Sequence, residues 1–288
     1  LTCYEVSDRD GKEVCRQAIE ENINFIEKHN NNKDSKVKGM FGLHAAFTIE
    51  NETFEEIMSR NVKSGFHIHV SEAVDDSIIN VNKYNLSAVE RLHKYGITGE
   101  NSLFIHCNHH SEKDIEIIKN TKTNLVHNPQ SNMKNGVGTA NIIRYLDEGI
   151  RVGLGTDGMS SGMFDAVNFA SLIHKHDRRD SNVGFMESYK LIMENNPAIA
   201  SKLLGYDIGK IKENYKADLI ILDYIPATPI NDDNFWGHFL FGVIPSARVE
   251  TNIVDGKILM ENYKLINIDE EQISKEARKL ASKIWEKI

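Results

Sequence analysis

Short β-type apolar runs alternate with longer amphipathic stretches up to residue 205, and this alternation constrains the fold more than any other feature of the sequence. The β-type runs cover residues 1–6, 39–44, 66–70, 103–106, 123–126 and 151–155. Helical patterns lie between them at residues 12–28, 52–62, 87–95, 112–119 and 141–147. A repeated strand, helix, strand order implies parallel strands joined by right-handed crossover helices. The sequence therefore predicts an α/β fold around a parallel sheet.

The pattern changes after residue 205. Residues 209–223 predict a turn and a buried strand, and residues 249–260 predict a hairpin. The tail has an acidic first turn, which the helix dipole favours, and it places Ile273, Leu280 and Ile284 on one helix face. We therefore predict three parts, which are an α/β part over 1–205, a small β module over 206–268, and a docked terminal helix over 269–288.

The composition narrows the class of protein. The 288 residues carry 42 acidic and 34 basic side chains, a formal net charge of −8. This balance argues against nucleic acid or an anionic membrane as the partner, because both attract basic surfaces. No apolar run approaches the roughly 18 residues that span a bilayer, no signal-peptide pattern opens the chain, and the three cysteines show no zinc-finger or disulfide spacing. We expect a cytoplasmic protein that acts on a small molecule.

Side chains that can do chemistry gather at the carboxyl ends of the β-type runs. In chain order they are His44, His67, His69, Glu72, His106 and Asp157. Parallel α/β folds, and barrels above all, place their active sites at this edge of the sheet. One histidine at a strand end is ordinarily a hydrogen-bonded, half-buried residue. Several strands that each deliver a histidine or an acid to the same edge instead favour an active site.

Histidine and aspartate together favour a borderline metal ion such as zinc or iron, since no cysteine pair competes for it. Such an ion lowers the pKa of a bound water towards ~7, which makes hydroxide available at neutral pH. Glu72 follows His69 by three residues and is placed to shuttle protons without binding the metal. The residues alone thus predict a site that uses a metal-activated nucleophile.

Five ordered motifs carry a family resemblance. They are Gly42-Leu-His44, His67-Ile-His-Val-Ser-Glu72, Ile105-His-Cys107, His127-Asn-Pro-Gln-Ser-Asn-Met-Lys134 with Gly136-Val-Gly138, and Leu154-Gly-Thr-Asp-Gly158. Together they resemble the amidohydrolase superfamily, and within it the deaminase/chlorohydrolase branch. The opening residues 2–11 resemble the SsnA type of aminohydrolase in that branch. The resemblance extends over essentially the whole chain.

This resemblance implies a (β/α)8 TIM-type barrel, of which strands 3 to 8 are present as a partial barrel in residues 1–205. The C-terminal part of a small β-sandwich follows in residues 206–268. It also implies hydrolysis of a C–N bond, the deamination of a cyclic amidine such as a purine or pyrimidine derivative. The implied cofactor is a divalent metal, with zinc preferred to iron.

The resemblance also implies roles for single residues. His69 and Asp157 match metal ligands, and Asp157 matches the catalytic base as well. Glu72 matches the proton shuttle. His106 matches the histidine that polarises the substrate or the hydroxide, and His44 matches a histidine that faces the substrate. The expected catalytic residues are therefore Glu72, His106 and Asp157, and the expected substrate contacts are His44 and His106.

One feature of the family is missing. Its first metal motif, a His-x-His on strand 1, lies far upstream of strand 5, and only 68 residues precede His69. We therefore expect the chain to lack an N-terminal segment, to need that segment or another copy of itself, and to be inactive alone. Two other interpretations stay open. One is a non-catalytic barrel fragment or partner subunit, and the other is a metal site in which His67 and His69 are the missing pair, with Asp157.

Three weaker signals accompany these motifs. Asn128, Ser131 and Asn132 match a family loop beside the site, but they also fit an ordinary turn and helix cap. His109 and His110 are predicted to be exposed loop residues, although one of them could contact substrate. Residues 174–179 are predicted to be the solvated, charged end of a helix.

Overall fold

The computed structural model describes residues 1–32 and 35–287. The chain forms two compact units, Leu1–Tyr206 and Asp207–Ile288. No helix among the described residues combines the length and the apolar character that crossing a membrane requires. Both units contain a sheet, parallel in the first and antiparallel in the second.

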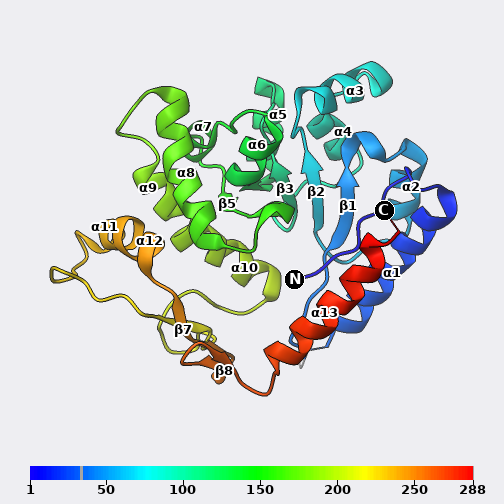
Figure 1. The fold of residues 1–288 in the computed structure, drawn as a ribbon. Coiled ribbons are helices and arrows are strands. Elements are labelled where there is room, and N and C mark those ends of the chain that lie inside the picture. Colours follow the sequence, from blue (N-terminus) through cyan, green and yellow to red (C-terminus); the bar gives the residue numbers. More distant parts are fainter. Residues whose placement is uncertain (33–34, 288) are drawn as a thin grey trace. The chain divides into compact units, whose positions relative to one another are not determined.

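The first unit is built on a five-stranded parallel sheet in the order β1-β2-β3-β4-β5 (Figure 1). Its strands are β1 (Phe41–Ala45), β2 (Phe66–Val70), β3 (Leu103–His106), β4 (Asn124–His127) and β5 (Val152–Leu154). Each strand pairs with the next one along the chain, and every pairing is parallel. The predicted α/β class is confirmed, and the five strands end at one common edge.

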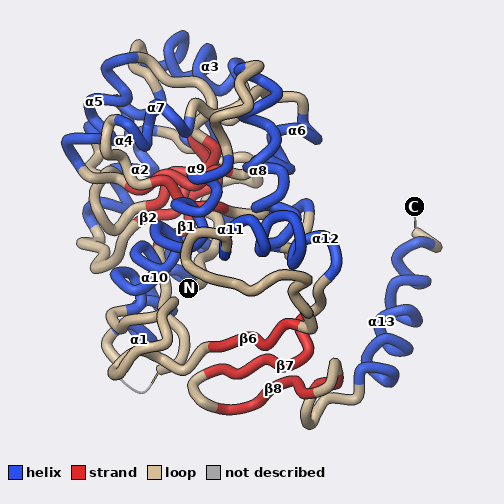
Figure 2. The backbone as a smooth tube through the Cα atoms, turned by 90° about the vertical axis from the view of Figure 1, so that its left-hand side faces the viewer, coloured by secondary structure: helices blue, strands red, loops and turns tan. Residues whose placement is uncertain are grey.

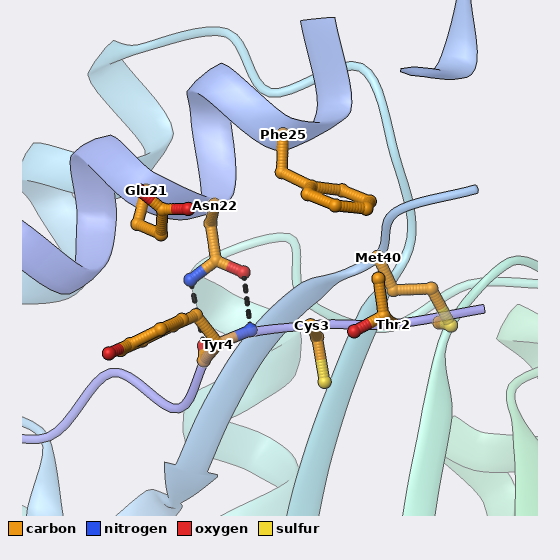
Figure 3. Close-up of a pocket in the computed structure, with 7 residues that line it drawn as sticks. All are labelled: Thr2, Cys3, Tyr4, Glu21, Asn22, Phe25 and Met40. Carbon is orange, nitrogen blue, oxygen red and sulfur yellow. Dashed lines mark hydrogen bonds between the residues drawn. The ribbon is translucent and has the colours of Figure 1, made fainter. Parts of the chain in front are cut away.

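The run over residues 1–6 is not the strand that the sequence predicts. It makes only two isolated parallel bridges to the first strand region, Thr2 to Gly39 and Val6 to Leu43. Between the bridges, the Asn22 side chain replaces the ladder, because it accepts from Tyr4 N–H at 3.0 Å and donates to Tyr4 O at 2.7 Å (Figure 3). A small cavity of about 50 Å³ lies beside this contact, well apart from the residues discussed below. The segment is thus held by backbone hydrogen bonds at the two bridges and, between them, by a side chain from a helix.

Helices connect the strands of the first unit. Their bounds are α1 (Lys12–Asn30), α2 (Asn51–Ser59), α3 (Val74–Tyr84), α4 (Ala88–Lys94), α5 (Glu112–Thr121), α6 (Pro129–Asn135), α7 (Ile142–Asp147), α8 (Met163–Arg178), α9 (Phe185–Tyr189) and α10 (Asn196–Leu204). Short 3-10 turns follow β1 and β5 as η1 (Ala46–Thr48) and η2 (Asp157–Met159), and the π-helix η3 (Lys190–Asn195) joins α9 to α10. Two helices begin as the sequence dictates, because Ser87 and Ser111 accept hydrogen bonds from the N–H groups of Glu90 and Asp114.

Strand β2 shows how the sheet aims its side chains. Phe66, Ile68 and Val70 are buried, whereas His67 and His69 between them are half-buried. Successive side chains of a strand point to opposite faces, so both histidines lie on one face and the apolar residues on the other. The apolar face joins a core with fully buried residues from several helices, among them Ile19, Ile57, Leu92 and Ile118.

The second unit is a four-stranded antiparallel sheet in the order β6-β7-β8-β9, with a helical segment between β6 and β7 and a helix after β9 (Figure 2). The elements are β6 (Leu219–Leu222), α11 (Phe235–His238), the π-helix η4 (Phe239–Val243), α12 (Ile244–Ser246), β7 (Val249–Val254), β8 (Lys257–Glu261), β9 (Lys264–Leu265) and α13 (Glu270–Trp285). The hairpin of β7 and β8 turns at Asp255 and Gly256, which both have positive φ. The sequence did not predict the helical segment 235–246.

Helix α13 forms where the sequence predicts a helix, but its apolar residues stay exposed. Ile273, Leu280 and Ile284 are 57%, 60% and 60% exposed. Asp269 caps the helix by accepting from Gln272 N–H at 2.9 Å. The local pattern therefore decides that this segment is helical, and the docking of its apolar face stays a prediction.

Candidate active site

The carboxyl ends of β1, β2, β3 and β5 surround a cavity of about 360 Å³. It is lined by Arg9, His44, Ala45, Phe47, His69, Glu72, Asp76, His106, Asn135 and Asp157. The residues proposed from the sequence as catalytic, metal-binding or substrate-binding are all among them. His67 is not, although it lies on the same strand face as His69.

Two carboxylates and one imidazole converge at the centre of this cavity. His106 Nε2 lies 3.6 Å from Glu72 Oε2 and 3.8 Å from Asp157 Oδ2. One ligand atom from each of the three residues lies within 4.8 Å of the others, a spacing that suits a shared metal ion. The chemistry of the donor set, nitrogen and carboxylate oxygen, therefore fits zinc or a similar divalent ion.

The backbone around these residues is unusual. Ser71, His106, Cys107 and Asp157 all have positive φ, of 49°, 71°, 55° and 55°. Residues other than glycine rarely adopt this left-handed region, at a cost of about 1–2 kcal/mol each. Such conformations persist only where surrounding contacts enforce them, and they concentrate at functional sites. Here they turn the chain sharply at the ends of three neighbouring or nearby strands and aim the side chains into the cavity.

His69 is held in one orientation by the preceding strand. Its Nδ1 lies 2.5 Å from the main-chain oxygen of His44. A carbonyl oxygen only accepts, so Nδ1 carries the proton and Nε2 keeps its lone pair. This arrangement is typical of metal-binding histidines, whose second nitrogen is fixed by a carbonyl or carboxylate.

His44 has a similar arrangement at the end of β1. Its Nδ1 lies 3.0 Å from Thr48 Oγ1, and that hydroxyl donates to Ala45 O at 2.9 Å. Partial burial lowers the pKa of His44, against the opposing charge of Glu5. The ring is therefore biased towards the neutral form, with Nε2 available as an acceptor for a ligand in the cavity.

The short helix α6 contacts all three central groups. Ser131 Oγ donates to Asp157 Oδ2 at 2.5 Å, Asn132 Oδ1 lies 2.9 Å from His106 Nδ1, and Asn135 Nδ2 donates to Glu72 Oε1 at 3.0 Å. Ser131 and Asn132 are fully buried. The sequence allowed two interpretations of this segment, a family loop beside the site or an ordinary turn and helix cap. The structure favours a position beside the site, and the segment there is a helix.

Asp157 is kept ionised by its hydrogen bonds. Burial acts to raise the pKa of Asp157, but the Ser131 hydroxyl and the Gly158 N–H both donate to the carboxylate and hold the pKa below its ordinary value. The turn that carries it needs a glycine at position 155, because a Cβ there would lie 2.3 Å from Asn128 Oδ1. The Leu-Gly-Thr-Asp sequence thus allows β5 to end against α6.

Comparison with known proteins now assigns the chain to a family. The sequence profile of the amidohydrolase family matches residues 2–259. The chain belongs to the amidohydrolase family. This confirms the resemblance that the five sequence motifs indicate.

Curated relatives of this amidohydrolase are deaminases. A 5-methylthioadenosine/S-adenosylhomocysteine deaminase from Pelotomaculum thermopropionicum is 33% identical over 275 residues, which cover 93% of this chain and 63% of the relative. A 5'-deoxyadenosine deaminase from Methanobrevibacter smithii is 33% identical over 297 residues, covering 98% of this chain and 66% of the relative. The chain thus spans a little less than two thirds of the length of these relatives.

Solved structures share the amidohydrolase fold. An adenosine deaminase from Xanthomonas campestris, solved with bound zinc, superimposes with a TM-score of 0.81 at 19% identity, over 99% of this chain and 66% of that one. A guanine deaminase from E. coli superimposes with a TM-score of 0.74 at 20% identity, over 89% of this chain and 63% of that one. At such low identity the likeness shows the fold alone.

Some histidines of this amidohydrolase lie elsewhere than predicted. His174 is 2% exposed, so the prediction of a solvated helix end over 174–179 is wrong for this residue. Its Nε2 lies 3.2 Å from Nε2 of the equally buried His127. His109 and His110 are half-buried, and His109 Nε2 contacts Val137 O at 2.9 Å, so they are not the exposed loop residues that the sequence predicts.

Several residues of the site were not predicted from the sequence. Arg9 and Phe47 line the cavity and contact each other, with the guanidinium carbon 5.3 Å from the ring centroid. Asp76 accepts from the N–H groups of Glu72 and Ala73 and so fixes the chain after β2. Only Asn135 carried a usable signal, because it lies one helical turn after Ser131 and hence on the same side of α6.

Proposed function

We propose that this amidohydrolase is a metal-dependent aminohydrolase that deaminates an adenine nucleoside. The convergence of His106 Nε2 on the carboxylates of Glu72 and Asp157 carries the proposal. The relatives support the substrate class, because 5-methylthioadenosine, S-adenosylhomocysteine and 5'-deoxyadenosine share an adenine base. Adenine contains the cyclic amidine, a ring C=N beside an amino group, that the motifs lead us to expect.

His69 and Asp157 are the proposed metal ligands. The fixed Nδ1 of His69 leaves its Nε2 free, and the hydrogen bonds to Asp157 favour its ionised form. A bound divalent metal lowers the pKa of a coordinated water, which supplies the nucleophile at neutral pH. We propose zinc rather than iron for two reasons. Zinc is commonly bound by a mixed set of histidine nitrogen and carboxylate oxygen, and the Xanthomonas structure was solved with zinc.

The protein's own groups manage the protons of the reaction. Water adds to the amidine carbon, so that a C–O bond forms, the C–N bond to the amino group breaks and ammonia leaves. Asp157 is the proposed acceptor of the proton lost by water, and Glu72 the proposed donor to the ring nitrogen and the departing amine. His106 faces the same point from β3 and orients the attacking oxygen or the substrate, and His44 contacts the substrate from β1.

The finer fold assignment is part of the proposal. We propose that β1 to β5 correspond to strands 4 to 8 of a (β/α)8 barrel, with the bridged segment 1–6 in the place of strand 3, and that residues 206–268 belong to a β-sandwich. The parallel order of the sheet and the solved amidohydrolases support this numbering. The division at 206–268 and 269–288, the likeness to the SsnA type and a cytoplasmic location stay predictions.

Ammonia release from defined nucleosides tests the proposal. The intact enzyme that contains this chain is loaded with zinc and incubated with 5'-deoxyadenosine, 5-methylthioadenosine and S-adenosylhomocysteine, and the conversion of each adenine to hypoxanthine is followed by absorbance. Turnover that chelation abolishes and zinc restores supports the proposal. Tight zinc binding without turnover of any of the three would instead favour the non-catalytic partner subunit, and zinc held after His69→Ala would contradict the proposed ligands.

A further inference from the structure

Two asparagines connect the backbone after β2 to the imidazole at the end of β3. Asn108 Nδ2 donates to Glu72 O at 2.9 Å, and Asn132 Nδ2 donates to Asn108 Oδ1 at 2.7 Å. Asn132 Oδ1 lies 2.9 Å from His106 Nδ1. Asn132 and His106 are 1% and 2% exposed, so water does not compete for the bond between them. An unbroken row of hydrogen bonds thus runs from one main-chain carbonyl to the histidine ring.

The carbonyl at the start of this row fixes the direction of every bond in it. Glu72 O can only accept, so Asn108 must present its amino group there and its oxygen to Asn132. Asn132 must then present its amino group to Asn108 and its oxygen to His106. With either amide reversed, two oxygens would face each other at a hydrogen-bond distance, which leaves buried acceptors unpaired. His106 Nδ1 therefore has to donate.

We propose that Asn108 and Asn132 are positioning residues that hold neutral His106 in the tautomer with the proton on Nδ1. The bare Nε2 then points towards Glu72 Oε2 and Asp157 Oδ2, at 3.6 and 3.8 Å. Three atoms with lone pairs face one another there. Asp157 Oδ2 also accepts from Ser131 Oγ, and a cation or a shared proton would bridge the lone pairs that remain. The asparagines thus keep the cavity open for a metal ion or a proton in transit. In the other tautomer, Nε2–H would donate a hydrogen bond to a carboxylate, and this bond would occupy the place of the metal ion or proton.

A pair of substitutions at Asn108 separates this role from ordinary packing. Asn108→Ala removes the residue that orients Asn132, so the Asn132 amide can rotate and both tautomers of His106 become available. In Asn108→Asp the new carboxylate still accepts from Asn132 Nδ2, so Asn132 keeps its orientation and the tautomer is retained. A purely structural role predicts the opposite ranking, because a carboxylate that faces Glu72 O is worse for stability than a methyl group.

The tautomer is measured directly by nitrogen NMR of chain labelled with ¹⁵N-histidine, without added metal, at alkaline pH. Protonated and bare ring nitrogens resonate far apart, and the His106→Gln spectrum identifies the His106 signals. We expect a protonated Nδ1 in the wild type and in Asn108→Asp, and a mixture in Asn108→Ala. The matched control is Asn22→Ala, which removes another buried asparagine that bonds only to backbone groups of residues 4, 18 and 42.

Zinc affinity provides a second readout. Loss of a group that orients a metal-site residue typically costs about 10- to 100-fold, so we expect Asn108→Ala to bind zinc about 10-fold more weakly than Asn22→Ala and Asn108→Asp. A wild-type His106 with the proton on Nε2, or an Asn108→Ala spectrum identical to the wild type, would overturn the proposal. The consequence of this proposal for catalysis rests on the proposed function, whereas the tautomer of His106 is independent of that function. Absence of ammonia release with the expected spectra would thus count against the proposed function alone.

Discussion

The two edges of the parallel sheet use the same strands in opposite ways. At the amino edge, side chains form hydrogen bonds with main-chain N–H and C=O groups. Ser102 Oγ accepts from Phe66 N–H at 3.2 Å and donates to Ile97 O at 2.7 Å, and Thr123 Oγ1 accepts from Gly99 N–H at 2.9 Å. At the carboxyl edge, side chains from α6 bond to the reactive groups while His69 and His106 keep lone pairs directed into a cavity.

The difference separates stability from function within one sheet. Bonds at the amino edge satisfy buried main-chain groups, so each of them lowers the free energy of the fold. The carboxyl edge contains four non-glycine residues with positive φ and acceptor atoms that face one another, and both features cost free energy. In parallel α/β enzymes the carboxyl edge is the place for catalysis, and residues at the amino edge serve stability. Substitutions at the two edges should therefore affect different measurements.

The largest effect is expected for Asp157→Asn at the carboxyl edge. The amide removes the charge that holds a metal and the proposed base, so kcat for ammonia release by the intact enzyme should fall by about 10³-fold or more. The thermal midpoint of the chain should change little, because the amide oxygen can keep the bond from the Ser131 hydroxyl, and the exposed Gly158 N–H that loses its acceptor can bond to water. Asp147→Asn at the exposed end of α7 is the control. Retention of a tenth of the wild-type kcat would remove Asp157 from the mechanism.

The buried pair of His127 and His174 predicts an acid-sensitive stability. Burial lowers the pKa of His174 to about 4 and holds the pKa of His127 well below its ordinary value. The unfolded chain binds protons below about pH 6.5 and the folded chain does not, so stability is full above that pH and falls as the pH drops towards 4. His174 alone should account for about 3 kcal/mol of this loss.

Urea unfolding at pH 7 and at acid pH tests the pair. His174→Gln should be less stable than the wild type at neutral pH, because His127 loses its partner, but its stability should depend less on pH. Parallel pH profiles for the two proteins would show that the acid sensitivity arises elsewhere.

Glu72→Gln should lower kcat by about 10²- to 10⁴-fold while zinc binding is kept. The amide can still accept from Asn135 Nδ2, so the position of the side chain is preserved, but it cannot transfer a proton. Zinc content and ammonia release are measured on the same sample. Loss of zinc would make Glu72 a ligand together with His106 and Asp157, the group whose atoms lie within 4.8 Å.

The smallest effect on turnover is expected for Ser102→Ala at the amino edge. This substitution leaves the buried Phe66 N–H and Ile97 O without their partner, so the free energy of unfolding should fall by about 1–3 kcal/mol. Both kcat and KM should remain at their wild-type values. A changed kcat would show that the two edges are coupled, and the contrast drawn above would then need revision.

The positions of His44, His69, Glu72, His106 and Asp157 around one cavity could be predicted from the sequence. All of them follow β-type runs, and parallel strands bring their ends to one edge whatever the details of packing. The partners of these residues could not be predicted in the same way. Asn108, which follows β3, connects to the site only because α6 lies against the end of that strand and brings Asn132 to it, and the spacing of residues along the chain does not encode that contact.

The sequence by itself determined the alternation of strands and helices from β1 to β5, the edge at which chemistry gathers and the family, because periodicity and motifs are local properties of the chain. Tertiary structure alone decided that residues 1–6 are held by Asn22, that His174 is buried against His127, and which nitrogen of His106 is bare. The reason is physical. Whether two residues far apart in sequence form a hydrogen bond depends on differences of a few tenths of an ångström in the distance between donor and acceptor. Only the packing of the folded chain sets that distance.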